Sequence, residues 1–497
     1  MNRIVSSLFF ITLSSLHVLG QSYPTELLKY TAPQMVGTAR SIGAGGAFST
    51  VGADMGAALS NPAGLGLYRG SEISGSLALN FTQDKSVFGG SNLASKSTNF
   101  FLPHLGAVFA IPLKRPGQST NFFQIGVVYQ KTADFNREQA FNGINNANSK
   151  VDVYFNELTA TNANIDYTNF SPEAVQAWNT YLVDTFNGSF FKRAYAPVNQ
   201  SGYYSERGGA NEVSLSLSGN INDKFYIGGA LGLPWMKYSR TQLYSENIDY
   251  IDSVYGFQGF DQYSTYTVSG LGVNFKLGFI ARPLDFWRVG VSITTPSIFF
   301  NLEEKSSLST SARYTDLTQN LVFDSDTFLT APYQFKYSRP LNATFGTSFI
   351  ISKWGLISID YQLTDYKNMR VGFDDVAKVA EDAYNKQISA LYGIGHMVKV
   401  GGEFAWKVWR IRAGYNWQST PFQSGIGVKG YDMQAHTATA GLGYRGKRFF
   451  ADLAYARTMM NDYRSLYRTT VNEPGIQSKF VQNRIVATVG FRFGGKN

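Results

Sequence analysis

Apolar and polar residues alternate along most of this chain with a period of two. Between Val213 and Ser218 the order is Val, Ser, Leu, Ser, Leu, Ser, and similar alternation fills residues 72–84, 357–364 and 411–418. Successive side chains of a β-strand point to opposite faces, so the pattern predicts strands with one apolar and one polar face. A soluble β-sandwich would produce the same pattern, so alternation alone does not identify the architecture.

The number and length of these segments narrow the choice. We predict about 14 strands, an even number of the kind found in bacterial single-chain barrels. The predicted strands are Glu72–Asp84, Phe100–Leu113, Asn121–Ala133, Ala210–Ile221, Lys224–Tyr238, Tyr263–Ala281, Phe286–Leu302, Tyr333–Ile351, Trp354–Met369, His396–Trp406, Trp409–Thr420, Ala435–Tyr444, Arg448–Met460 and Phe480–Phe493.

The connections between the predicted strands alternate in length. Tight turns such as Ser352-Lys353 and Lys407-Val408 interleave with long links. Short turns on one rim and long loops on the other are typical of outer-membrane barrels. The pattern therefore favours an all-β transmembrane antiparallel β-barrel over a sandwich. The predicted long loops are Asp134–Gly209, Ser239–Gln262, Glu303–Pro332, Arg370–Gly395 and Asn461–Lys479.

Aromatic residues gather where the predicted strands meet their turns. Trp354, Trp406 and Trp409 flank tight turns, as expected of the aromatic girdles at a membrane interface. Phe225, Tyr226, Trp235 and Tyr238 lie near the two ends of one strand and are assigned to the same girdles. The alternating aromatic end of the last strand, residues 489–493, resembles the signal for insertion into an outer membrane.

The N-terminus predicts export. Residues 1–20 combine Arg3 with an apolar run and read as a signal peptide, which is too short to span a membrane and would be cleaved before Gln21. Residues 21–71 are then a periplasmic N-terminal segment, which we call the hatch segment, and residues 72–497 the barrel. This organisation predicts the outer membrane of a Gram-negative bacterium as the location, with outer-membrane lipids, lipopolysaccharide and the barrel-assembly machinery as partners.

Residues 39–70 form a glycine-rich and nearly uncharged stretch, here called the glycine-rich segment. Ordering so many glycines is costly in entropy, so the segment is expected to fold inside a structure that already exists. Phe48 stands where a dinucleotide-binding fingerprint needs its third glycine, which argues against a Rossmann loop. The informative motif is Asn61, Pro62, Ala63, Gly64 and Leu65.

With the preceding ARSIGAGGAFS, this motif resembles the N-terminal hatch of the outer-membrane long-chain fatty-acid and hydrocarbon transporters, the FadL/TodX-type family. The resemblance implies a plug within the barrel lumen whose NPA tripeptide lies beside a hydrophobic ligand. It also implies that a kinked strand opens a lateral gap in the wall, through which the ligand leaves sideways. Pro103, Pro234 and Pro296 each remove a ladder hydrogen bond from a predicted strand, but they do not identify the kinked one.

Composition excludes several other functions. The chain has no cysteine and no GxSxG, P-loop or HExxH motif, so no enzyme activity and no cofactor are predicted. Its net charge of +9 comes from scattered Lys and Arg residues. Because they form no cluster, we expect anionic lipid head groups and not nucleic acid as the counterpart.

Candidate ligand contacts come from the predicted lumen face and the loops. Lys399, Arg412 and Arg484 are predicted to face the lumen, where Arg484 or Lys399 could pair with a ligand carboxylate, although a structural polar network is the simpler interpretation. A second set forms the apolar stripe of a predicted loop helix that begins at Ser171-Pro172: Val175, Trp178, Leu182 and Phe186. A second loop helix is predicted after Asp374, with Val376, Val379, Ala380 and Ala383 as its apolar face.

The predicted function is passive uptake of long-chain fatty acids or other hydrophobic small molecules. One alternative is a non-transporting barrel that acts as a scaffold or carrier in protein secretion, as in type IX secretion. Another is a haem-binding receptor, because His396 and His436 open strands at the same rim. Solvated rim histidines are the simpler interpretation, because no metal site is otherwise marked.

Overall fold

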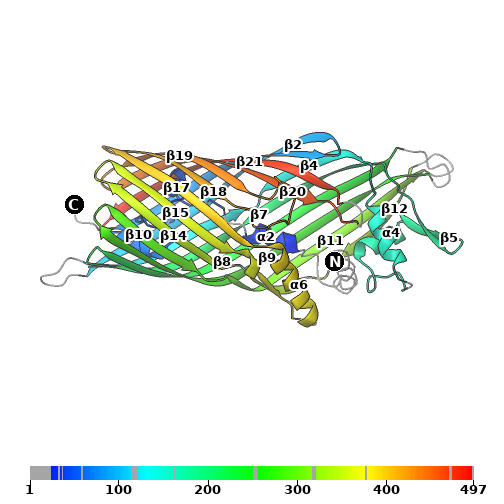
Figure 1. Ribbon diagram of the computed structural model, residues 1–497, viewed down its shortest axis with the longest axis horizontal. Coiled ribbons are helices and arrows are strands. Elements are labelled where there is room, and N and C mark those ends of the chain that lie inside the picture. Colours follow the sequence, from blue (N-terminus) through cyan, green and yellow to red (C-terminus); the bar gives the residue numbers. More distant parts are fainter. Residues whose placement is uncertain are drawn as a thin grey trace.

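The computed structural model describes residues 24–494, apart from residues 32–33, 36, 57–59, 114–120, 162, 250–255, 316–320, 375–377 and 470–472. The predicted signal peptide lies outside the described residues. Nineteen of the described strand segments form one closed antiparallel sheet, in which β1 pairs with both β2 and the last strand, β21. Four passes are interrupted, so the segments make up a barrel of fourteen strands (Figure 1). None of the described helices has the length and apolar character needed to cross a membrane.

The strands run alternately between a rim of short turns and a rim of long loops. In Figure 1 the C-terminus marks the short-turn end, at the left. The segments are β1 (Ser71–Phe88), β2 (Ser91–Leu113), β3 (Asn121–Asp134), β4 (Arg137–Asn145), β7 (Val198–Ile221), β8 (Phe225–Ile248), β9 (Phe257–Leu284), β10 (Trp287–Thr294), β11 (Ile298–Thr315), β12 (Leu321–Leu329), β13 (Tyr333–Ser338), β14 (Asn342–Ile351), β15 (Gly355–Asp365), β16 (Arg370–Gly372), β17 (Ile394–Trp406), β18 (Trp409–Gln418), β19 (Ala435–Arg445), β20 (Phe449–Ser465) and β21 (Gly475–Phe493).

The predicted alternation of faces is confirmed. Leu215 and Leu217 on β7 are 46% and 54% exposed on the outside of the barrel, whereas Ser214, Ser216 and Ser218 are buried inside it. An apolar outer face is required where the wall meets lipid, and the enclosed lumen accepts the polar face.

Two of the five predicted long loops proved instead to be largely strand. The range Ser239–Gln262 is largely the far half of the β8–β9 hairpin, and Glu303–Pro332 is largely the β11–β12 hairpin. These hairpins are rich in Ser, Thr, Tyr and Gln on both faces. A wall that projects beyond the membrane meets water and not lipid on its outer face, so that face need not be apolar. The loss of apolar alternation therefore marked the membrane boundary, and the strands continue past it.

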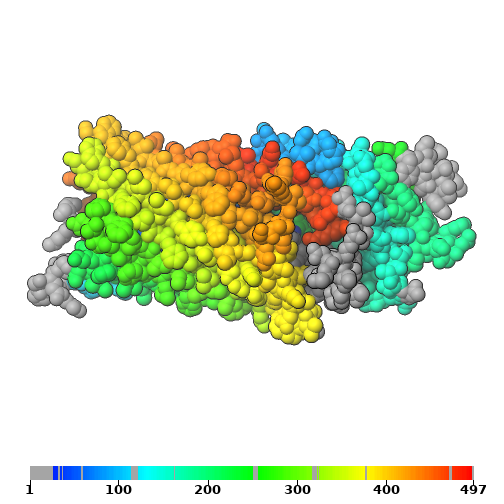
Figure 2. All heavy atoms as spheres, in the orientation of Figure 1, coloured from blue at the N-terminus to red at the C-terminus, as the bar shows by residue number. Residues whose placement is uncertain are grey.

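This extension is confined to one side of the barrel. Strands β7, β8 and β9 have 24, 24 and 28 residues, whereas β15, β17, β18 and β19 have 11, 13, 10 and 11. Figure 1 shows the green long strands reaching toward the right end, while the yellow and orange strands end near the middle, as they also do in Figure 2. The barrel thus has a tall wall and a low wall, and helix α6 (Lys378–Leu391) stands at the top of the low wall.

Proline interrupts two predicted strands at one level. The seventh pass breaks at residues 295–297, around Pro296, and the eighth breaks at residues 339–341, around Pro340. The two breaks face each other, because the Arg339 backbone N–H donates to the Ser297 carbonyl oxygen at 2.9 Å. The sequence prediction had both strands continuous, since the residues on each side keep the correct phase.

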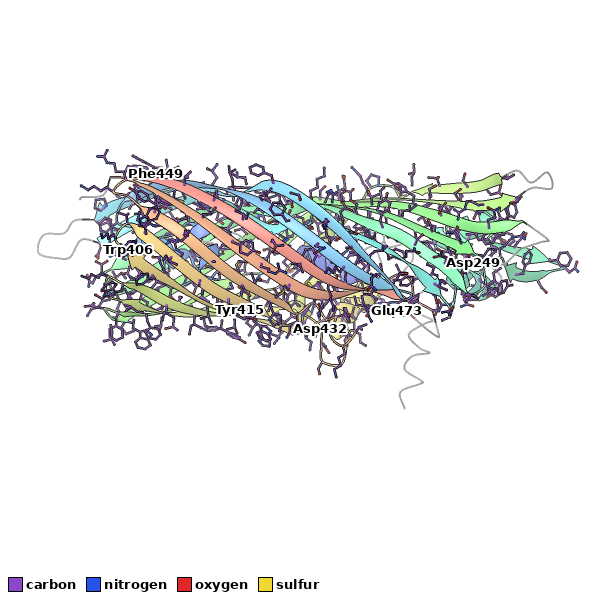
Figure 3. The ribbon with its side chains drawn as sticks, turned by 90° about the horizontal axis from the view of Figure 1, so that it is seen from above. Asp249, Trp406, Tyr415, Asp432, Phe449 and Glu473 are labelled. Carbon is purple, nitrogen blue, oxygen red and sulfur yellow. The ribbon has the colours of Figure 1, made fainter. Side chains whose placement is uncertain are left out.

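The girdle prediction was half right. Trp354, Trp406 and Trp409 are 53%, 55% and 49% exposed at the short-turn rim, and Figure 3 shows Trp406 at that end together with Phe449. Tyr226 and Tyr238, however, are each 1% exposed and point into the lumen. They have the opposite phase from Phe225 and Trp235 on β8, so the alternation overrides their aromatic character.

Candidate functional site

The lumen holds two different environments, one above the other. The glycine-rich segment fills the half near the short turns, with α3 (Ala39–Gly43) and the 3-10 helix η2 (Pro62–Leu67). Helix α2 (Pro24–Thr31) lies farther toward the long loops, inside the barrel near its middle (Figure 1). Both parts of the hatch segment are therefore enclosed by the wall.

A ring of buried aromatic residues surrounds α2, and we call it the aromatic chamber. Its walls come from β8, β9, β11, β13 and the connection between β15 and β17, and its roof includes α6 and the short helix η3 (Tyr366–Asn368). The chamber residues are Met236, Tyr238, Tyr266, Phe299, Leu302, Phe335, Tyr337, Tyr366, Met369, Phe373, Tyr384, Ile388 and Tyr392, all buried. An enclosed apolar space with a few polar groups is the usual form of a small-molecule site.

Helix α2 occupies the chamber with its apolar face. Leu27, Leu28 and Tyr30 are at most 2% exposed and belong to the same cluster as the chamber walls. The rings of Tyr30 and Tyr238 meet edge to face with centroids 5.5 Å apart, and the Tyr30 hydroxyl donates to the Tyr266 hydroxyl at 3.3 Å. The chain therefore fills its own apolar pocket.

Charged residues hold the other face of α2. Glu26 accepts a hydrogen bond from Arg240 at 2.6 Å, and Lys29 donates to Glu206 at 2.5 Å. Glu206 also pairs with Arg464 at 2.9 Å. Burial by itself would raise the pKa of Glu26, but Arg240 and Lys29 outweigh it and hold that pKa at about 2. The attachment of α2 thus combines apolar packing with an ion-pair network.

Arg339 brings a cation to the chamber, and Glu212 and the Tyr337 hydroxyl act on it electrostatically without a direct ion pair among the described residues. Its guanidinium carbon lies 5.1 Å from the centroid of the Phe299 ring, and one of its terminal nitrogens lies 3.9 Å from the Met236 sulfur. The Nε atom is buried with no hydrogen-bond partner among the described residues. A buried unsatisfied donor is costly, so a polar group arriving in the chamber would bind here favourably.

The glycine-rich segment rests on inward-facing glycines of the wall. A Cβ atom added at Gly228 would lie 2.5 Å from the Pro62 carbonyl carbon, and one at Gly401 or Gly414 would lie 2.6 or 2.5 Å from the Ala44 carbonyl carbon. We call these positions the glycine seat: Gly228, Gly278, Gly290, Gly346, Gly401, Gly414 and Gly441. Sequence reasoning missed it, although glycine at inward positions of neighbouring strands was the available signal.

The NPA motif is built as predicted locally. Asn61 caps η2, with its side-chain oxygen accepting from the Ala63 N–H at 3.1 Å, and Pro62 occupies the first turn. Ala63 packs on Tyr226 and Ile280, close to the short-turn rim. Gly64 and Leu65 are also buried within the lumen.

The motif does not meet the aromatic chamber. The chamber begins at Met236, ten residues farther along β8 than Tyr226, which is about 30 Å at the rise of a strand. The ligand role that the resemblance gives to the motif therefore stays a prediction, and the contacts place Asn61 in the closure of the lumen.

The three predicted lumen cations also lie at the level of the glycine-rich segment. Arg412 is fully enclosed between Glu403 and Asp452, at 2.7 Å from each, and Lys399 donates to Gln362 at 2.9 Å. The remaining cation, Arg484, donates to Asn80 at 2.8 Å and to the backbone oxygen of Met35. All three face the lumen, but their recorded partners belong to the wall and the hatch segment, and the chamber cations are different residues.

The wall has a seam between its second and third passes. Backbone pairing between β2 and β3 ends at His104 and Gln130, and above that point β4 pairs with β7 alone. The third pass breaks at residues 135–136, which directly follow Asp134. Pro103, whose ring has no N–H to donate, stands where the pairing ends.

A polar cluster fills the seam. Asp134 accepts hydrogen bonds from the side chains of Asn80, Asn99 and Asn136 at 2.7, 3.1 and 2.6 Å. The Gln34 side chain exchanges two hydrogen bonds, both 3.0 Å, with the backbone of Asp134. The hatch segment is thereby tied to the break in the third strand.

Loop helices cover the long-loop end. The first is α5 (Pro172–Asn179), capped by Ser171, and it packs with α4 (Val151–Thr159) near the β5–β6 hairpin (Val183–Phe186 and Ser189–Lys192). In the predicted stripe, Val175 and Leu182 are buried and Trp178 is half-buried in the core of this cap. The helix ends before Leu182, and Phe186 lies on β5 and is 64% exposed, so the stripe was wrong at that residue.

In the second predicted helix, α6, the apolar face was right in part: Ala380 and Ala383 are half-buried, but Val379 is not on the buried face. Tyr384 and Ile388 are buried, whereas Val379 is 82% exposed; Val376 lies outside the described residues.

The two rim histidines have protein partners. His396 hydrogen-bonds the Tyr361 hydroxyl and His436 the Tyr415 hydroxyl, each at 2.6 Å. Within the described residues, no group of three His, Cys, Asp or Glu side chains could hold a metal ion.

The fold is that of the FadL/TodX-type outer-membrane barrels, as the resemblance of the hatch motif predicted. The crystal structure of the Pseudomonas putida toluene transporter TodX matches with a TM-score of 0.52 and 14% identity, over 93% of this chain and 99% of that chain. A Pseudomonas aeruginosa FadL homologue matches with a TM-score of 0.56 and 12% identity, over 94% of this chain and 100% of that chain. No family model and no curated protein matches the sequence.

Proposed function

We propose that this protein takes up hydrophobic small molecules passively across the outer membrane. The observation that carries the proposal is the aromatic chamber, whose apolar walls enclose helix α2 of the same chain. An apolar ligand gains about 0.8 kcal/mol per buried CH₂ group, so a long chain can displace a short helix without an energy source.

The route starts at the long-loop end and cannot run straight through the barrel. Below the chamber the glycine-rich segment contacts the wall with backbone on backbone, as at Gly401 and Gly414. The seam between β2 and β4 is the remaining exit, and the Asp134 cluster is its closure. Because Gln34 joins α2 to that cluster, displacement of α2 would pull on the closure.

The chamber also suggests which hydrophobic molecules are carried. Arg339 offers the N–H of its Nε atom, which has no hydrogen-bond partner among the described residues, so a long-chain acid can place its carboxylate there and its chain among the aromatic rings. Lys399 and Arg484, which the sequence favoured for this role, already have partners at a different level.

Uptake of a labelled long-chain fatty acid, by cells that lack their own transporter, tests this function. The intact protein should confer uptake above an empty vector, and deletion of residues 21–31 should lower it while the barrel remains in the membrane. R339Q should reduce uptake of the acid but not that of a neutral alkane, and K399Q is the matched control. If the intact protein confers no uptake, the secretion scaffold becomes the better reading.

A further inference from the structure

The outer surface carries a groove on the low wall, over β15, β17, β18 and β19. Ile357, Gly402, Ala413 and Ala440 pair side by side across these strands, so three small residues follow one another in one row. The row toward the short turns is large: Phe404, Ile411 and Leu442 are 46%, 50% and 57% exposed. The small residues are therefore the floor of a trough and the large residues are its lower wall.

The trough has the volume of a ligand site. One part, about 430 Å³, is lined by Ile351, Trp354, Ile357, Gly402 and Phe404 among others. A second part, about 350 Å³, continues past Ile411 over Ala440 and Leu442. In Figure 2 this yellow and orange surface faces the viewer. Because the trough lies on the lipid-facing side, its occupant must be apolar.

Two lysines stand at the short-turn end of the same hairpins. Lys353 and Lys407 are exposed, and their ammonium groups lie 5.8 Å from the ring centroids of Trp354 and Trp406. Neither forms an ion pair with a described residue. Lysine and tryptophan together mark the interface of a membrane, where the ring is half in lipid and the ammonium reaches the head groups.

The short-turn rim as a whole carries positive charge, like these two lysines. Lys224, Lys447 and Arg448 are also exposed without an acidic partner among the described residues. The two acids in the described short turns, Asp223 and Asp285, each pair with an arginine of the same rim. The rim therefore attracts anions, and in a barrel of this kind it faces the periplasmic leaflet.

We propose that the trough and the two lysines bind an anionic glycerophospholipid of the periplasmic leaflet. One acyl chain lies across Gly402, Ala413 and Ala440, between the walls of Phe404 and Ile411 on one side and the row of Val400 and Tyr415 on the other. The phosphate group lies against Lys353 and Lys407. This site is separate from the lumen, so it stands whether or not the chamber carries a substrate.

Native mass spectrometry of the full-length protein tests the proposal, with the protein extracted from bilayers of phosphatidylglycerol and phosphatidylethanolamine. Phosphatidylglycerol should be retained in preference, and the K353Q/K407Q variant should lower its retention on the order of tenfold. K305Q/K336Q is the matched control, because both lysines are exposed at the long-loop end.

Filling the trough gives an independent readout. A Cβ atom at Gly402 would meet only the Leu356 carbonyl oxygen, at an ordinary 3.5 Å, so G402L should insert normally. It should lose the retained phospholipid although both lysines are intact. Equal retention of the two lipids, equal loss in both lysine variants, or a lipid-free dimer that covers this face would each overturn the proposal.

Discussion

Closure of the lumen depends on glycine at the inward positions of the seat, and Gly401→Ala tests this with a neighbouring control. A methyl group at Gly401 would lie 2.6 Å from the Ala44 carbonyl carbon and would also overlap the carbonyl oxygen. Both atoms are backbone, so no side chain can swing aside. The glycine-rich segment must move by about 1 Å to restore van der Waals separation near 3.5 Å.

The size of the effect follows from the cost of overpacking. Extra methyl groups in a packed site cost about 1 to 3 kcal/mol each. In a double variant that carries Gly401→Ala and Gly414→Ala, the two added methyl groups overlap the backbone of Ala44 and Gly45. The shift also breaks the Gly45 N–H bond to the Thr439 hydroxyl, now 3.0 Å. Gly402→Ala faces outward with open space, so it should be neutral or slightly stabilising, because alanine loses less backbone entropy than glycine.

Permeation of a small hydrophilic antibiotic into cells measures the closure, and protease cleavage within residues 39–70 measures the exposure of the segment. The double variant should raise both while its barrel remains heat-modifiable on gels. Wild-type permeation and cleavage in the double variant would refute the tight seat. Equal damage from Gly402→Ala would show that any alanine weakens these strands.

Three further outcomes follow from the same geometry. Leu217→Arg should impair membrane insertion by about 2 to 4 kcal/mol if the residue lies near the midplane. Ser216→Arg should insert but displace the glycine-rich segment, because Ser216 is 1% exposed inside the lumen. The reverse result would show that the lipid-facing and lumen-facing residues of this strand have been exchanged. Asn61→Ala should remove a helix cap worth about 1 kcal/mol and speed proteolysis of the segment without unfolding the barrel, and an unchanged rate would exclude Asn61 from closure. Because the pKa of Glu26 is lowered to about 2, its contribution to α2 docking is full above the ordinary value of 4.5 and is lost as the pH falls toward 2. A fluorophore on a cysteine introduced at Gln21, in a chain without other cysteines, should report release of α2 only in that acid range. Release near neutral pH would contradict the ion-pair attachment.

The sequence alone determined the barrel, its strand count and the phase of its strands. A wall between lipid and lumen needs apolar and polar side chains on alternate residues. This alternation can be recognised from neighbouring positions in the sequence, as in Leu215, Ser216 and Leu217. The hatch motif was readable for the same reason, because the cap of Asn61 and the turn of Pro62 involve only adjacent residues. Where both faces of a strand meet water, as beyond Ser239 on β8, apolar and polar residues no longer need to alternate, and the strand was missed.

The tertiary structure decided where the parts meet, because those contacts join residues far apart in the chain. Gly401 reads as an ordinary strand glycine until Ala44 is placed against it, and Arg339 reads as a loop cation until Phe299 and Met236 surround it. Helix α2 likewise carries no mark of its site, since its chamber is assembled from four strands, two helices and the connection between β15 and β17, which only closure of the barrel brings together.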